Sequence, residues 1–405
     1  MAVVGAGICG LSCAYHLAAE HGIQAVVLDA GAVGWGASGR NAGFVCHGAI
    51  RANAAHLADR HGEDAVRRAF AAESDGIARV MAIAADENFD IGRQGEAIVT
   101  VADRPSHWAQ LAAECETLRR FGAGPAELAS RDAFVERGFI SPEQHGALFA
   151  PGYGIHPLRY VQGLAGAAVR RGARLHGASP ALALAKEGVR YCLSTPGGCV
   201  RTKRIVLAMN GYWDEALYRP LAGRAMPVLS NIAITRPLSP GERAEHRFAT
   251  ENPVSNTRNL LSYFRMLPGG RLLFGGRGDT TGSPADSARM RRALERRLAE
   301  IFPAWAGIDT EFFWRGFIAA TRRFTPAVGR MADDPGVHYA FGCHGNGVAF
   351  MTWAGHALAR LAATGDEGAI PALFRAPPPR LPPPTLRPWA LRALLALYAI
   401  RDRLG

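Results

Sequence analysis

Two short stretches near the start of the chain consist almost entirely of glycine and other small residues. The first, GAGICG at 5–10, matches the pattern G-x-G-x-x-G, and the second, GWGASGRNAG, covers 34–43. Backbone without bulky side chains lets a ligand reach the N–H groups that bind phosphate. Asp29 lies between the two stretches, where a carboxylate can accept the ribose hydroxyls of a dinucleotide. Together these residue types indicate that the chain binds a dinucleotide.

The elements around GAGICG are those that a dinucleotide site needs. An apolar strand is predicted over 2–4, an amphipathic helix follows the glycines, and a second apolar strand covers 24–28. In this frame Gly5 permits a tight turn, Gly7 lets the backbone approach a pyrophosphate, and Gly10 lets the helix pack closely on the strand. A glycine-rich turn in an unrelated βαβ unit is the alternative, and the complete strand–helix–strand–acid frame argues against it.

The second stretch separates NAD from FAD, which share the first pattern. A nicotinamide enzyme has no reason for another glycine-rich cradle directly after the second strand, whereas the ribityl chain and ring of a flavin lie along backbone N–H groups. We therefore expect FAD, with Ser38, Gly39, Arg40 and Asn41 beside the flavin. A solvent-facing loop arginine is the alternative for Arg40. A nicotinamide enzyme stays as a competing hypothesis, against which the late segment GCHGNG argues.

The stretch GWGASGRNAG resembles the corresponding segment of the D-amino-acid-oxidase-like superfamily of FAD enzymes. Within that superfamily it looks most like the branch that contains gamma-glutamylputrescine oxidoreductase. Four later segments extend the resemblance in the same order along the chain, at 152–177, 204–213, 269–280 and 342–355. Their number and order make a chance match a poor explanation.

Fold class and cofactor follow from the resemblance. It implies an α/β protein, with a Rossmann-like FAD-binding domain and an α+β substrate domain built on an antiparallel sheet. Some relatives tether the flavin through a cysteine in the segment equivalent to 314–321, where this chain has WRGFIAAT, so non-covalent FAD is expected. A histidyl tether at His47 is the alternative. The expected cofactor-binding residues are Gly5, Ala6, Gly7, Gly10, Asp29, Ala30, Ser38, Gly39, Arg40, Asn41, Gly43, Ala181, Asn210, Gly211, Gly342, His344, Gly345, Asn346, Gly347 and Val348.

The resemblance and the element pattern also divide the chain. The last part, 371–405, is predicted to be a stiff proline-rich linker, APPPRLPPP, followed by a helix that is too short to span a membrane. Packing on its own domain is the default for that helix, and an interfacial or oligomer contact is the alternative. The FAD-binding domain is expected to take 1–95, 146–210 and 326–370, and the substrate domain 96–145 and 211–325.

The chemistry implied by the family is hydride transfer from the carbon that bears an amine to flavin N5, which oxidises a CH–NH or CH–NH2 donor. The partners are then a small amine, with or without an anionic group, and oxygen or another electron acceptor. Three residues are candidates for catalysis or substrate contact: Arg265 for a carboxylate or other anion, Tyr263 on the same predicted strand, and His47 after the flavin loop. Solvation at the rim is the alternative for Arg265, and a purely structural histidine is slightly favoured for His47.

Three features depart from the family pattern. Several relatives place a lysine near flavin N5 to assist reaction with oxygen, and neither Lys186 nor Lys203 is expected there, so oxygen is not assured as the acceptor. Ile318 stands where amino-acid oxidases often carry a carboxylate-binding arginine, and Arg323 stands where near relatives carry an aspartate. A free α-amino acid is therefore a weaker candidate than an amine. The predicted first strand begins at once, at Ala2, and we expect it to be clipped.

Composition narrows the function classes. The 405 residues carry a formal net charge of +11, but only two of the basic residues are lysines and the arginines are scattered, so a biased genome explains the charge better than nucleic-acid binding. The seven cysteines include no C-x-x-C pair, which favours a reducing, cytoplasmic compartment. Cys192 and Cys199 flank the turn TPGG, but we predict no disulfide between them. No apolar run is long enough to span a bilayer, and no signal peptide and no metal site are predicted.

Three functions stay open at this point. The favoured one is an FAD-dependent amine oxidoreductase, either an oxidase or a dehydrogenase that passes electrons to an acceptor other than oxygen. The second is a nicotinamide enzyme. The third is a flavin-binding protein or subunit without amine turnover, which the missing lysine and Arg323 keep open.

Overall fold

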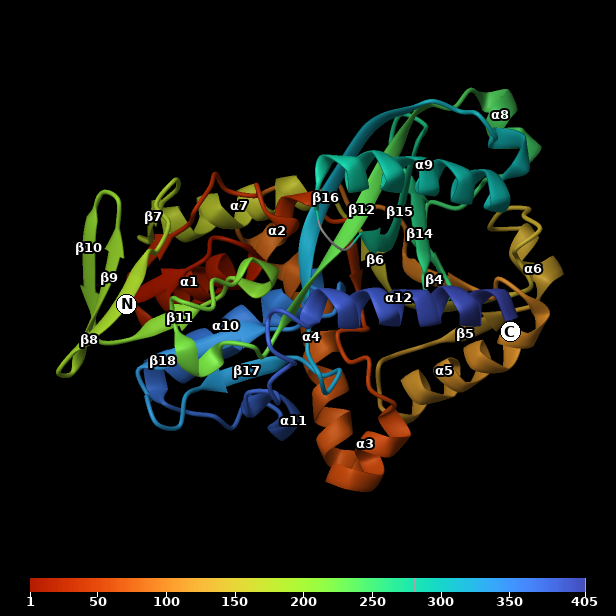
Figure 1. Cartoon of the computed structure of the whole chain (residues 1–405). Helices are drawn as coiled ribbons and strands as arrows, with labels where there is room; N and C mark the ends of the chain where they lie inside the picture. Colours follow the sequence, from red (N-terminus) through yellow and green to blue (C-terminus); the bar gives the residue numbers. More distant parts are fainter. Residues whose placement is uncertain (280–281, 405) are drawn as a thin grey trace.

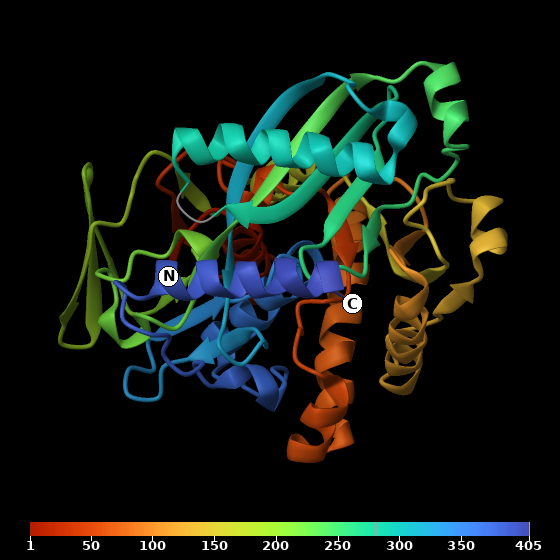
Figure 2. The same cartoon turned by 45° about the vertical axis from the view of Figure 1, so that its right-hand side comes forward.

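The computed structural model describes residues 1–279 and 282–404 and has the predicted α/β architecture. Figure 1 shows two large sheets side by side, with helices packed against them and α12 (Arg387–Leu404) crossing in front of the region between them. Figure 2 shows the same relation from a second direction. The chain starts in the first sheet and ends beside the second.

Six strands form the first sheet, in the order β17-β18-β11-β1-β2-β7. β1 (Ala2–Val4) is central and pairs in parallel with β2 (Val26–Leu28) on one side and β11 (Ile205–Leu207) on the other. The three strands are uninterrupted apolar runs, as expected of a parallel sheet that is buried on both faces. β17 runs antiparallel to β18 at the edge. The remaining strands are β7 (Arg174–His176), β17 (Ala327–Arg330) and β18 (Val337–Phe341).

Helix α1 (Ile8–His21) connects β1 to β2 and packs against α10 (Val348–Thr364). The two helices approach so closely that a Cβ atom on Gly355 would lie 2.5 Å from the carbonyl oxygen of Cys9. A Cβ atom on Gly10 would lie 1.9 Å from the carbonyl oxygen of Gly5, so glycine at position 10 lets α1 pack on β1. These small residues let the start of α1 pack closely on β1 and on the middle of α10.

The second sheet has the strand order β16-β12-β15-β14-β13-β4-β6-β3, with β5 beside β6. Its neighbours run antiparallel except β4 and β13. Helix α9 (Pro284–Ile301) packs on it through Met290, Leu294, Leu298 and Ile301, the stripe that the sequence predicts. The strands are β3 (Phe44–Cys46), β4 (Ala97–Val101), β5 (Glu127–Ala129), β6 (Ala147–Gly154), β12 (Met226–Pro237), β13 (Val254–Asn256), β14 (Ser262–Met266), β15 (Arg271–Asp279) and β16 (Thr310–Ala320).

A small antiparallel sheet consists of β8 (Ala183–Glu187), β9 (Arg190–Thr195) and β10 (Gly198–Thr202), with the predicted turn between the last two. Our prediction that no disulfide forms here is wrong, because the structure joins Cys192 to Cys199. The pairing of β9 with β10 brings the two Cα atoms to 6.2 Å, which is within the span of a disulfide.

The sheets do not follow the predicted domain boundaries everywhere. β6 lies in the range 146–210 that we assign to the FAD-binding domain, yet it pairs with β4 in the second sheet. β3 directly follows the expected flavin loop and also joins the second sheet, through β6. At β3 the chain thus passes directly from the second glycine-rich stretch into the second sheet.

The C-terminal helix α12 links two distant parts of the molecule. At its start, Arg387 forms an ion pair with Glu215, which follows β11. Near its end, Asp402 is buried and accepts hydrogen bonds from the backbone N–H groups of Asn259 (2.8 Å) and Leu260 (2.9 Å), between β13 and β14. Throughout 1–279 and 282–404, every helix is too short or too polar to cross a membrane.

The other helices cover the sheets or form short connections. They are α2 (Ala37–Arg40), α3 (Ala54–His61), α4 (Glu63–Asp86), α5 (Trp108–Arg120), α6 (Arg131–Val135), α7 (Pro157–Arg170), α8 (Pro240–Glu245) and α11 (Ala372–Arg375), with 3-10 turns at Pro105–His107, Asn210–Tyr212, Arg219–Leu221 and Pro303–Trp305.

Candidate functional site

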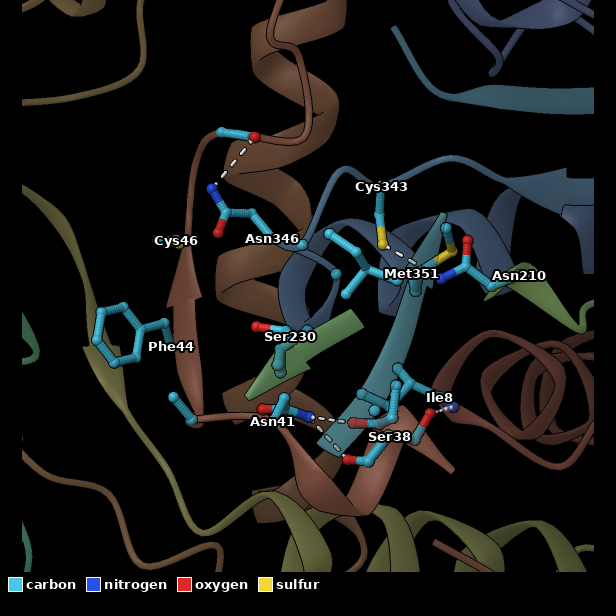
Figure 3. Close-up of a pocket in the computed structure, with 18 of the residues that line it drawn as sticks. Ile8, Ser38, Asn41, Phe44, Cys46, Asn210, Ser230, Cys343, Asn346 and Met351 are labelled. Atoms are coloured by element: carbon cyan, nitrogen blue, oxygen red, sulfur yellow. Dashed lines mark hydrogen bonds between the residues drawn. The ribbon is translucent and has the colours of Figure 1, made fainter. Parts of the chain in front are cut away.

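A cavity of about 860 Å³ is lined by residues from both large sheets and from the loops that join them. Figure 3 shows part of its wall, with Ser38 and Asn41 on one side and Cys343 and Asn346 on the other. These residues come from the two glycine-rich regions that lie about three hundred positions apart in the sequence. The cavity is therefore the place where the predicted motifs meet.

Most of the residues that we single out from the sequence lie in this wall, and some lie behind it. Those that line the cavity are Gly5, Ala6, Gly7, Asp29, Ala30, Ser38, Arg40, Asn41, His47, Ala181, Asn210, Tyr263, Gly345, Asn346, Gly347 and Val348. Within the described chain, Gly10, Gly39, Gly43, Gly211, Arg265, Gly342 and His344 do not contribute to the wall.

Two helix N-termini face the cavity. α1 begins after Gly7 and α10 begins after Gly347; both glycines line the cavity and have no side chain with which to cap their helix. Ser38 Oγ accepts one N–H of α1, from Ile8, at 3.1 Å. Uncapped N–H groups and the positive end of the helix dipole favour an anion, such as a pyrophosphate.

The first loop leaves no room for side chains, which is what a cradle for a large ligand requires. Gly5 has a φ of +102°, which disfavours every other residue, and a Cβ there would lie 2.8 Å from the carbonyl oxygen of Ala208. A Cβ on Gly7 would lie 2.8 Å from Ser38 Oγ. The residues present therefore fit the FAD that the sequence predicts.

The carboxylate of Asp29 also accepts hydrogen bonds from within the protein. Its carboxylate accepts hydrogen bonds from the backbone N–H groups of Ala6 (2.6 Å) and Gly31 (2.9 Å) and from Trp35 Nε1 (2.7 Å). The acid thus fixes the first glycine-rich loop against the segment after β2. A carboxylate oxygen can accept two hydrogen bonds. Oδ1 accepts those of Gly31 and Trp35, whereas Oδ2 accepts only that of Ala6 and has one position left for a ligand hydroxyl.

Asn41, the single amide in GWGASGRNAG, makes hydrogen bonds within its own loop. Its Nδ2 donates to the carbonyl oxygens of Ala37 (3.1 Å) and Ser38 (2.8 Å), and its Oδ1 accepts the N–H of Gly43 (2.7 Å; Figure 3 shows the bond to Ser38). The amide holds the shape of the loop from inside. Arg40 lies at the exposed edge and its Nη1 is 3.4 Å from the carbonyl oxygen of Arg315 in β16.

Side-chain hydrogen bonds also hold the late glycine-rich loop, which begins at Gly342. Asn210 adopts a φ of +46°, and its side chain accepts the N–H of Gly342 at 3.0 Å and donates to Cys343 Sγ at 3.5 Å. His344 Nδ1 donates to the carbonyl oxygen of Ala49 at 2.8 Å, and Nε2 accepts the N–H of Thr321 at 3.1 Å. Burial lowers the pKa of His344 to about 4, so the imidazole is neutral and joins three loops.

Glu73 is the main residue that sequence reasoning missed. It is 1% exposed, and its carboxylate accepts the backbone N–H groups of Gly48 (3.2 Å), Ala49 (2.6 Å) and Ile50 (3.2 Å). The same carboxylate lies 3.3 Å from His47 Nδ1. A signal was available, because Glu73 falls on the apolar stripe of α4, where a charged residue needs a buried partner.

Two of the three residues proposed for catalysis or substrate contact differ in their access to the cavity. Tyr263 lines the cavity, but its hydroxyl is engaged by Ser230 Oγ (2.7 Å) and the carbonyl oxygen of Asn231 (3.2 Å). Arg265 lies behind the wall, 4% exposed, and its Nη2 donates to the carbonyl oxygen of Ile155 at 2.6 Å. Arg265 therefore does not reach a ligand in the cavity.

His47, the third candidate, lines the cavity with both ring nitrogens engaged. Nδ1 lies 3.3 Å from Glu73, and Nε2 lies 3.3 Å from Ser74 Oγ. These contacts suit the structural role that the sequence slightly favours. Both lysines lie outside the wall, and Lys186 pairs with Asp334 at 2.7 Å.

Comparison with known proteins supports FAD as the ligand of this cavity. The family model described as "DAO: FAD dependent oxidoreductase" matches residues 1–361. Gamma-glutamylputrescine oxidoreductase of Escherichia coli (strain K12) is 31% identical over 409 aligned residues, which cover 100% of this chain and 92% of that protein.

Solved structures show the same fold. Glycine oxidase from Geobacillus kaustophilus superposes with a TM-score of 0.73 at 21% identity, covering 92% of this chain and 97% of that one. L-Proline dehydrogenase from P. horikoshii gives a TM-score of 0.76 at 19% identity, covering 92% and 96%. At these identities the likeness concerns the fold. With the glycine-rich cradle and the match over residues 1–361, it follows that this chain belongs to the DAO family of FAD-dependent oxidoreductases.

Proposed function

We propose that this flavoprotein oxidises the C–N bond of an amine or an amino-acid derivative. The observation that carries the proposal is the continuity of one cavity from the glycine-rich loops to the second sheet, where Tyr263, Ile232 and Ile318 form its wall. Bound FAD supplies a hydride acceptor for the carbon next to nitrogen. Gamma-glutamylputrescine oxidoreductase, glycine oxidase and L-proline dehydrogenase carry names of this reaction class, which supports the proposal.

The chain's own contribution is to bind, orient and desolvate. Apolar side chains in the wall exclude water from the carbon that is oxidised. Burial raises the pKa of Tyr263 to about 12, so its hydroxyl stays protonated and can only donate or accept a hydrogen bond. The amine must enter neutral, because a protonated nitrogen has no lone pair to assist loss of a hydride. The cofactor is held, in this proposal, by the cavity-lining residues of the two glycine-rich loops and by Asp29.

We further propose that the electrons leave through an acceptor other than oxygen. The proposal rests on the two lysines, both of which lie outside the cavity wall, whereas several relatives use a lysine near the flavin for oxygen. Hydrogen peroxide production and reduction of an artificial dye, measured on the same protein and the same amine, separate the two acceptors. Peroxide formed at the rate of amine consumption would contradict a non-oxygen acceptor.

A cytoplasmic location is also our proposal, on the ground that Cys9, Cys13, Cys46, Cys115 and Cys343 are free. In that compartment the hairpin pair Cys192 and Cys199 would be reduced. Alkylation in intact cells followed by mass spectrometry tests this, because both thiols should carry the label. A persistent disulfide would place the protein in an oxidising compartment.

The decisive test of the reaction is anaerobic. Purified holoenzyme is mixed with a panel of amines without oxygen, and the flavin absorption near 450 nm is followed. An amine substrate should bleach it, as dithionite does. If dithionite bleaches the flavin and every amine fails, the chain is a flavin-binding protein without amine turnover.

A further inference from the structure

The C-terminal helix α12 is attached to the rest of the protein along one side. Over Arg387–Leu404, all of which the structure describes, the buried residues are Leu391 and Asp402. The segment before the helix is held as well, because the N–H of Leu381 donates to the carbonyl oxygen of Gly223 at 2.6 Å. The helix therefore has a defined orientation, and its other side faces away from the protein.

An apolar strip covers that other side. Successive residues of an α-helix are about 100° apart, so residues three, four and seven positions apart share a side. The side opposite the buried one carries Trp389, Ala393, Leu397, Ile400 and Leu404, which we call the outer face of α12. The exposed fraction is 67% for Trp389, 51% for Ile400 and 83% for Leu404. Figure 1 shows α12 running across the front of the molecule. A contiguous exposed apolar strip marks an interaction surface.

Arginines border the outer face on both sides. Arg392 and Arg403 lie along one edge and Arg401 along the other, and all three are exposed. The guanidinium of Arg392 lies over the ring of Trp389, 5.2 Å from its centroid. The one acid of the helix, Asp402, is buried on the opposite side. The outer face is therefore apolar along its middle and positively charged along its borders.

A second copy of the chain is a poor occupant for this surface. Two outer faces packed on each other would bring the bordering arginines of one copy against those of the other, and like charges removed from water are costly. The outer face is also a ridge without a groove. Within the described chain, its residues line neither the cavity of about 860 Å³ nor a smaller one of about 270 Å³ beside Arg387. Stable protein interfaces bury about 800 Å² on each partner, which a narrow ridge supplies poorly.

We propose that the outer face of α12 binds the surface of a bilayer that contains anionic lipids, with the helix lying in the plane of the membrane. The apolar side chains enter the boundary between headgroups and acyl chains, while the bordering arginines extend to the lipid phosphates. Tryptophan suits this depth, because its ring is apolar and its N–H is polar. The buried side of α12 takes no part, so the helix stays attached to the protein when it binds.

The test is co-sedimentation of the holoenzyme with lipid vesicles at low salt. Vesicles of phosphatidylcholine alone are compared with vesicles that also contain phosphatidylglycerol. Wild type should bind the anionic vesicles far more tightly than the neutral ones. Ile400→Ser should weaken this binding about tenfold, because one large apolar side chain no longer leaves water. The double substitution Arg401→Gln and Arg403→Gln should also weaken it about tenfold or more, through the loss of two charges beside the anionic surface.

The matched controls change the same residue types elsewhere on the surface. Val189→Ser alters an apolar side chain that is 80% exposed, in the turn between β8 and β9. The double substitution Arg292→Gln and Arg296→Gln removes two exposed charges from α9. Both controls should bind anionic vesicles as wild type does. Melting temperature and FAD content should equal the wild-type values in every variant, because the altered side chains are exposed.

Three results would overturn the inference. The first is wild-type protein that sediments equally with and without anionic vesicles. The second is an equal loss of binding in the α9 double variant, or none in Ile400→Ser, since adsorption would then follow the net charge of +11 rather than the outer face. The third is a wild-type dimer that Ile400→Ser converts to a monomer in sedimentation velocity, which would assign the face to a second copy. Vesicle binding is measured without an amine, so its outcome is separate from that of the proposed reaction.

Discussion

Glu73 Oε1 lies 2.6 Å from the backbone nitrogen of Ala49, so an acid in the middle of α4 organises the loop between β3 and α3. Replacing Glu73 with alanine should leave the N–H groups of Gly48, Ala49 and Ile50 without this acceptor, and the last two residues are buried. At about 1–3 kcal/mol for each unsatisfied group, partly relieved by water, we expect a loss of about 2–5 kcal/mol in the free energy of unfolding. Chemical denaturation of the apo protein measures it. Glu116→Ala, exposed on α5, is the control and should have little effect; equal stability of both variants would show that the loop does not depend on Glu73.

Asp29→Ala should weaken folding as well as FAD binding. From the motif alone, one expects an acid that is merely solvated without cofactor, but the structure gives it Ala6, Gly31 and Trp35 as donors. We expect a lower melting temperature of the apo protein together with a higher Kd for FAD. Trp35→Phe removes only one donor and should have the smaller effect on both. An Asp29→Ala apo protein as stable as wild type would mean that these bonds contribute nothing.

Stability should fall as the pH decreases from about 6.5. Burial lowers the pKa of His16 to about 3 and those of His338 and His344 to about 4, from an ordinary value of 6.5. Below pH 6.5 the unfolded chain binds protons that the folded chain does not, so unfolding is favoured by up to about 1.4 kcal/mol per pH unit for each histidine. Denaturation curves between pH 8 and pH 4 should show this slope. It should be reduced in His338→Asn and unchanged in His61→Gln, whose side chain is exposed.

Acid precipitation should release the yellow cofactor into the supernatant. Cys9, Cys46 and Cys343 line the cavity, but burial raises the pKa of the first two to about 12 and also raises that of Cys343. Thiols that stay protonated are poor nucleophiles towards a flavin. Both ring nitrogens of His47 already have partners. Flavin colour that stays with the denatured protein after washing would demonstrate a covalent bond and contradict this prediction.

Arg265→Met should leave ligand binding unchanged. The Arg265 side chain is buried behind the cavity wall, and its Nε and Nη1 have no hydrogen-bond partner in the described structure. Because burial alone lowers its pKa to about 10, removal of the charge should be neutral or stabilising, apart from the lost bond to Ile155. The amine that bleaches the flavin in the anaerobic test should bind with the wild-type Kd. A tenfold weaker Kd would return Arg265 to the binding site.

The contrast between Tyr263, which lines the cavity, and Arg265, which does not, shows what the sequence could not predict. Local patterns sufficed for the first glycine-rich loop, because turn, helix and strand follow from neighbouring residues. The position of an arginine relative to the cavity depends instead on how β14 pairs with β15, where Tyr263 lies opposite Gly275 and Arg265 opposite Leu273. Two residues along a strand move a side chain by about 7 Å, enough to take Arg265 behind the wall.

Glu73 and Cys192 illustrate two other limits. Glu73 was detectable as a charge on an apolar stripe, but its partners are N–H groups of a loop more than twenty residues away, which only the folded chain reveals. Cysteine usage in the whole chain argues against a disulfide. Whether Cys192 can reach Cys199 depends instead on how the two strands of the hairpin pair. Cysteine usage across the chain bears on the redox compartment, whereas the pairing of β9 with β10 sets the distance between these two cysteines.

The strand order of the first sheet has a consequence for biosynthesis. β1 precedes one of its neighbours by about two hundred positions, because β11 begins at Ile205 and the next strand, β18, begins at Val337. The N-terminus of α10 follows only at Val348. While the ribosome adds the intervening residues, the apolar edge of β1 has no partner, and the cradle has only one of its two helix ends. The complete cradle therefore requires the chain as far as Val348, and until β11 is added the open edge of β1 is an unpaired strand edge of the kind that promotes aggregation.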